Sequence, residues 1–204
     1  MRQIAFVITA VVIAAGSAAA AWKEFHQPQL GFSVEFPADP AVSTGSFHTA
    51  LVPSATAHIY SVKEDHALYV ATVVDLLDRK EEGANILNEA EFNLTLLGDV
   101  VETTPARVEG GRAAVWGHFV TIGCRSGKAP DQPGQTEAAH AWFKAITEVA
   151  CPDRGRLTVN MFFNRGRLYL IQGINLPSTA DSSFGPSALR FASSVSFFPP
   201  EPPR

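Results

Sequence analysis

The stretch that decides the fold reads LTVNMFF at residues 157–163, NRG at 164–166 and RLYLIQG at 167–173. Two runs of apolar and β-branched residues flank a short turn sequence that contains glycine. This is the pattern of a β-hairpin, in which a tight turn joins two antiparallel strands. The sequence therefore predicts a sheet with antiparallel pairing.

Alternating apolar and polar residues predict further strands elsewhere in the chain. The polar link at 64–67 is short enough to join two of them as a second hairpin. Pro37 and Pro40 lack a backbone donor and end the first strand. Gly110-Gly111 predicts a turn between the strands expected at 107–109 and 113–123. The predicted strands are Gly31–Phe36, Thr56–Lys63, Leu68–Leu76, Arg107–Glu109 and Ala113–Gly123.

Helical spacing of apolar residues predicts two helices. One spans residues 83–97, with Ile86 and Leu94 on its apolar face, and Gly98 follows where a helix stop is expected. The other begins near Pro186. Residues 137–150 could contain a short helix, or the second half of this segment could form a strand. The order of elements predicts an α+β fold in which helices flank an antiparallel sheet.

The first 20 residues have the three-part pattern of a secretory signal peptide. A positive start is followed by an apolar run of about a dozen residues and then by alanines. Small residues at the cut favour cleavage after Ala20 or Ala21, and an uncleaved anchor is the alternative. The sequence therefore predicts a periplasmic or secreted protein, with one domain at 21–198 and a proline-rich tail at 199–204 that we expect to be frayed.

The charge distribution excludes two classes of partner. The net charge is −4, and the longest basic run in the mature part is Arg79-Lys80. Nucleic-acid surfaces need clustered lysine and arginine, and so does electrostatic docking on anionic lipids. We therefore predict no nucleic-acid partner. No segment after the first 20 residues is apolar enough to cross a membrane, so we also predict no membrane span after processing.

The chain contains two cysteines, Cys124 and Cys151. An even count in an exported protein favours a disulfide, which would bracket an insertion at 124–151. Two free buried thiols or a metal pair are the alternatives. A metal is disfavoured because two cysteines do not complete a tetrahedral zinc site.

The mature start, with Trp22, Phe25 and LGFSVEFPADP at residues 30–40, resembles the opening of PsbP/Mog1-like bacterial secreted proteins. The last third is similar too, in NRGRLY at 164–169 and LRFASSVSF at 189–197. The resemblance covers about residues 22–198. It implies an α/β/α sandwich and, because members include photosystem II extrinsic subunits and a Ran-binding protein, a non-enzymatic binding role. The segment between the cysteines departs from the family pattern, so no binding residue is transferred.

Six histidines give no metal-binding spacing, neither an i, i+4 helix pair nor a His-x-His strand pair. His118 is predicted on a core strand beside Trp116, and His58 on another strand beside Tyr60. Both fit hydrogen-bonded strand histidines. If their strands were neighbours, His58 and His118 could together form a small-ligand or metal site.

Motifs for nucleotide binding and nucleophilic catalysis are absent from the sequence, which contains no G-x-S-x-G, G-x-G-x-x-G or Walker loop. Asp75, Asp78 and Glu81-Glu82 are interpreted as a solvated helix entry rather than a general-acid pair. We therefore predict no catalytic residue, no metal and no cofactor.

Trp142, Phe143 and Lys144 lie inside the cysteine-bracketed segment. They either anchor this segment onto the body of the domain or present a surface to a protein partner. The function predicted from sequence is an exported non-enzymatic binding or accessory domain of unknown partner. A small-ligand or metal-binding protein and a hydrolase with an unrecognised site are the alternatives.

Overall fold

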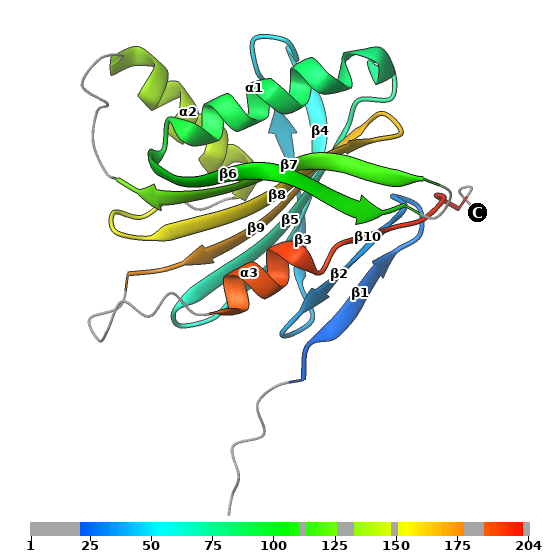
Figure 1. Ribbon diagram of the computed structural model, residues 1–204, viewed down its shortest axis with the longest axis horizontal. Helices are drawn as coiled ribbons and strands as arrows, with labels where there is room; N and C mark the ends of the chain where they lie inside the picture. Colours follow the sequence, from blue (N-terminus) through cyan, green and yellow to red (C-terminus); the bar gives the residue numbers. More distant parts are fainter. Residues whose placement is uncertain (1–20, 111–112, 126–132, 148–150, 178–185, 202–204) are drawn as a thin grey trace, which may run out of the picture.

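The structure is a computed structural model that describes residues 21–110, 113–125, 133–147, 151–177 and 186–201 (Figure 1). It is mostly β, with 49% strand and 23% helix. The predicted signal peptide at 1–20 lies outside the described residues. No helix in the described ranges is both long enough and apolar enough to span a membrane.

A seven-stranded antiparallel sheet forms the body of the molecule, in the order β3-β4-β5-β9-β8-β7-β6. The predicted hairpin at 157–173 is confirmed as its two central strands β8 and β9, and the predicted hairpin over 56–76 as β4 and β5. The strands are β3 (Ala41–Phe47), β4 (Ala55–Lys63), β5 (Ala67–Asp75), β6 (Gly98–Glu109), β7 (Ala114–Cys124), β8 (Arg156–Asn164) and β9 (Arg167–Asn175).

Two helices cover one face of this sheet, the upper face in Figure 1. They are α1 (Gly83–Thr95), which follows a short 3-10 helix η1 (Lys80–Glu82), and α2 (Pro133–Thr147). The apolar face predicted for α1 is confirmed, since Ile86, Ala90 and Leu94 are buried in the core cluster beneath it. The sequence did not distinguish helix from strand for residues 137–150. The described part of this segment, up to Thr147, is helical and belongs to α2.

The opposite face is covered by a second sheet together with one helix. Strands β1 (Lys23–Gln27), β2 (Phe32–Phe36) and β10 (Ser196–Phe197) form a three-stranded antiparallel sheet, and α3 (Pro186–Ser193) lies beside it (Figure 1). Aromatic side chains fill this second core, among them Phe32, Phe36 and Phe191. The Tyr169 hydroxyl donates to the Leu30 carbonyl at 2.7 Å, and burial raises the pKa of Tyr169 to about 12.

The expected α+β class and the α/β/α sandwich are therefore wrong. Strand dominates the chain, and a small sheet occupies much of the layer where the sandwich would have helices. The physical reason is that β1, β3 and most of β6 are exposed strands without the apolar alternation that sequence reasoning needs. Their backbone hydrogen bonds come from partner strands, which local sequence does not reveal.

The predicted disulfide is confirmed, because Cys124 and Cys151 are bonded with their Cα atoms 5.7 Å apart. It ties the end of β7 to the residues before β8, and α2 lies on the segment between them. The tail was expected to be frayed, and its described part contradicts this. The Glu201 amide donates to the Pro28 carbonyl at 2.9 Å, and the Phe198 amide to that of Gly31.

Candidate functional site

A groove with a volume of about 590 Å³ runs between α1 and the β6–β7 hairpin. We call it the α1 groove. Its walls combine apolar side chains with a few polar groups, which is typical of small-molecule sites. The described residues that line it are Gly83, Ala84, Leu87, Asn88, Glu91, Thr103, Thr104, Pro105, Trp116, Gly117, His118 and Phe163.

The groove lies where β6 and β7 continue as a pair past the last pairing of β7 with β8, at Gly117 and Phe162. Eleven pairs of residues join β6 to β7, and β6 is exposed along most of its length. Gly83 sets how closely α1 approaches, because a Cβ there would overlap the ring of Phe163. The first residue of α1 therefore packs directly against the Phe163 ring, and both residues line the groove.

His118 and Glu91 form the polar centre of the groove. His118 Nδ1 is hydrogen-bonded to Glu91 Oε2, which joins β7 to α1. The side chains are 29% and 22% exposed. A carboxylate on one ring nitrogen fixes the orientation of the imidazole and leaves the other nitrogen for a further partner.

Trp116 stands at the outer wall of the groove and is 64% exposed. The Arg107 guanidinium lies 5.6 Å from the centre of its ring, and the same guanidinium pairs with Glu109 at 2.8 Å. Sequence analysis placed Trp116 on a core strand. Strand β7 is internal as predicted, but Trp116 precedes the first residue of β7 that pairs with β8, and its indole is left in solvent.

His58 lies in a different cluster, on the face of the sheet that carries the small sheet. Its Nε2 is 3.1 Å from Asp75 Oδ2, and Arg167 Nε donates to Asp75 Oδ1 at 2.7 Å. Burial would raise the pKa of Asp75, but the hydrogen bonds from Arg167 and His58 outweigh burial and lower it. Asp75 is therefore a half-buried partner of two basic side chains and not part of a solvated helix entry.

The structure does not bring His58 and His118 together. Strands β5, β9 and β8 separate β4 from β7, and the two side chains lie on opposite faces of the sheet. The described residues contain no group of three or more histidine, cysteine, aspartate or glutamate side chains that could hold a metal ion. The hypothesis of one site built from both histidines is therefore wrong, and His118 alone belongs to the groove.

The hypothesis of a partner surface at residues 142–144 is also wrong for two of its three residues. Trp142 is 3% exposed and Phe143 is fully buried, and both pack in the core beneath α2. Lys144 is exposed on the outer side of the helix. The aromatic pair thus anchors α2 to the body, which was the alternative interpretation.

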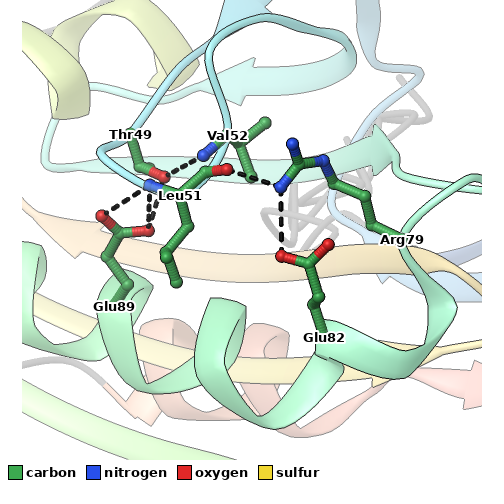
Figure 2. Close-up of polar contacts among 6 residues, drawn as sticks. All are labelled: Thr49, Leu51, Val52, Arg79, Glu82 and Glu89. Atoms are coloured by element: carbon green, nitrogen blue, oxygen red, sulfur yellow. Dashed lines mark hydrogen bonds and ion pairs between the residues drawn. The ribbon is translucent and has the colours of Figure 1, made fainter.

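The loop between β3 and β4 (residues 48–54) is hydrogen-bonded to Glu89 of α1 and to Arg79, and neither of these residues lines the groove (Figure 2). Glu89 accepts hydrogen bonds from the Thr49 hydroxyl at 2.5 Å and from the Leu51 amide at 3.3 Å. Arg79 donates to the Leu51 carbonyl at 2.6 Å and to Glu82 at 3.1 Å. These hydrogen bonds therefore fix the β3–β4 loop against α1 and the residues that precede it.

No family model and no curated protein matches the chain. The description of the site therefore depends on its geometry. Among the lining residues the sequence predicted only His118 as a site residue. Glu91 and Trp116 were missed, because nothing in their spacing shows that α1 packs beside β7. A carboxylate on the polar side of α1 is the one signal that could have suggested a partner for His118.

Proposed function

We propose that this chain is an exported, non-catalytic binding domain that holds an apolar ligand in the α1 groove. The observation that carries the proposal is the groove itself. Leu87, Pro105 and Phe163 give it apolar walls, Trp116 adds an exposed aromatic surface, and His118 with Glu91 gives one polar centre. An apolar pocket that contains a few oriented polar groups is characteristic of a ligand-binding site.

The chemistry of the groove favours binding over hydrolysis. A hydrolase of the nucleophilic kind needs a hydroxyl or thiol within hydrogen-bond reach of its histidine. Among the described residues, the hydrogen bonds of His118 and His58 go to carboxylates. This arrangement supports a role for His118 in orienting a bound group.

The assignment to the periplasm or the outside of the cell is part of the proposal. The disulfide supports it, because such bonds persist in oxidising compartments. The resemblance to PsbP/Mog1-like secreted proteins remains a prediction for function only, since the fold that it implied is wrong. Fractionation of cells that produce the full chain, followed by mass measurement, tests export and removal of residues 1–20.

A neutral dye that fluoresces in apolar surroundings, Nile red, tests the site. Ala84 is exposed and lines the groove, so Ala84→Phe fills it without disturbing the core. We expect this variant to weaken Nile red binding by about tenfold or more, since filling the site removes most of the contact area.

Asn85→Phe is the matched control, because Asn85 is exposed on the same helix but does not line the groove. We expect it to leave the affinity within about twofold of the parent protein. Equal binding by the parent and Ala84→Phe, or absence of binding by the parent, would contradict the proposed site.

A further inference from the structure

We infer that the ligand of the α1 groove is a neutral aromatic molecule that carries a hydroxyl group, of the phenol type. This inference rests on the proposed function and specifies its ligand. Three properties of the groove point to it: the free nitrogen of His118, the balance of charge along the walls, and the apolar surfaces that face one another.

The hydroxyl follows from the hydrogen bonding of His118. Because its Nδ1 faces the Glu91 carboxylate, the neutral imidazole carries its proton on Nδ1 and presents a lone pair at Nε2. No described residue makes a hydrogen bond to that Nε2. A ligand that approaches Nε2 must therefore donate a hydrogen bond. A hydroxyl both donates and accepts, so its oxygen can also accept a hydrogen bond from Thr103, which lies on the same face of the sheet as His118.

The neutral charge follows from the residues that surround the groove. No lysine or arginine occurs among its described lining residues, so an anion would meet the Glu91 carboxylate without a compensating cation. Arg107 stands nearby, but it is paired with Glu109. A cation gains little either, because the Glu91 carboxylate already faces His118.

The aromatic ring follows from the shape and chemistry of the walls. Trp116 offers a flat surface, and Leu87, Pro105 and Phe163 supply apolar area across the groove. Aromatic rings pack against indole in offset or edge-to-face arrangements that add to the gain from burial. The volume of about 590 Å³ is in the range of pockets that enclose small molecules.

The test compares three probes of one ring system: naphthol, its methyl ether and naphthalene sulfonate. Each is titrated against the intact mature protein by calorimetry and by displacement of Nile red. We expect naphthol to bind about tenfold more tightly than the ether, which cannot donate a hydrogen bond, and more tightly than the sulfonate. Equal affinity for naphthol and ether, or preference for the sulfonate, would overturn the inference.

Variants locate the source of the preference. In the double variant His118→Phe, Glu91→Gln, which leaves no unpaired carboxylate, we expect naphthol to lose its advantage over the ether. His66→Phe, at an exposed turn, is the control and should keep the advantage. Trp116→Leu should weaken both probes alike. Retention of the preference in the double variant, shown to be folded by circular dichroism, would contradict the role of His118.

The two proposals fail in different ways. If Nile red binds and responds to Ala84→Phe while the three probes show no preference, the site stands and the ligand class is wrong. If neither Nile red nor any probe binds, the proposed function itself is wrong.

Discussion

Asp75 shows how a single side chain can make the fold depend on pH. Its pKa lies below the ordinary value of 3.8, because hydrogen bonds from Arg167 and His58 outweigh the effect of burial. The folded state therefore holds the carboxylate ionised at a pH where the unfolded chain binds a proton. The resulting stabilisation is present above pH 3.8 and is lost as the pH falls through the lower pKa of the folded state.

We predict that Asp75→Asn lowers the free energy of unfolding at pH 7 by about 1 kcal/mol, a modest effect because the site is partly exposed. The difference from the parent protein should shrink as the pH falls below 3.8. Urea unfolding at a series of pH values measures both effects. Asp78→Asn, at an exposed position nearby, is the control, and a constant difference at all pH values would contradict the assignment.

Gln172 is a second residue with a measurable consequence. It is fully buried in the central strand β9, and neither its amide nitrogen nor its amide oxygen has a hydrogen-bond partner in the structure. Burying an amide without partners is unfavourable. We predict that Gln172→Met, which keeps the length of the side chain, raises the free energy of unfolding by about 1–2 kcal/mol. A loss of stability in chemical denaturation would show that the amide is satisfied in solution.

At the scale of elements, the β3–β4 loop and α1 form one unit through Glu89 and Arg79. We predict that Glu89→Ala releases this loop and lowers the free energy of unfolding by about 1 kcal/mol. Hydrogen exchange at the Leu51 and Val52 amides should speed up, because local opening governs exchange in such loops. Glu81→Ala, an exposed glutamate just before α1, should change neither quantity.

The strands and helices that sequence reasoning found are those with a strong apolar signal. The β8–β9 and β4–β5 hairpins were predicted from runs of apolar and β-branched residues that flank a short polar or glycine-containing link, and α1 was predicted from apolar residues at helical spacing. Only residues 107–109 of β6 were predicted, since this edge strand is exposed on most positions and contains Pro105. Such strands are held by their neighbours, and their own composition resembles that of a loop.

The candidate site was harder to predict than the fold for the same reason. His118 was selected as a residue, and its strand was predicted correctly, but its partner Glu91 comes from a helix 27 positions away in the sequence. Pairing His118 with His58 failed because strand order and the side of the sheet cannot be obtained from periodicity. The groove depends on how far β6 and β7 continue past β8 and on where α1 packs, and both are set by tertiary packing.

At the scale of the whole molecule, the disulfide joins the end of β7 to the residues before β8, and α2 lies in the segment between the two cysteines. We predict that replacing both Cys124 and Cys151 by serine lowers the free energy of unfolding by about 3 kcal/mol, because the disulfide closes a loop and so lowers the conformational entropy of the unfolded chain. Thermal and urea unfolding measure the loss. Thiol labelling of the parent protein should detect no reactive cysteine without reductant, and reaction at both would contradict the bridge.

The first and last strands of the described chain lie in the small sheet, where β2 has β1 on one side and β10 on the other. A ribosome makes β2 long before residues 196–197, so this ladder can close only after β10 has been made. Until then, burial is incomplete for three side chains that are fully buried in the folded protein, namely Phe32, Val34 and Phe36. The growing chain therefore exposes apolar surface to chaperones until β10 has been made, and a circular permutant that places β10 before β2 in the sequence would shorten that period.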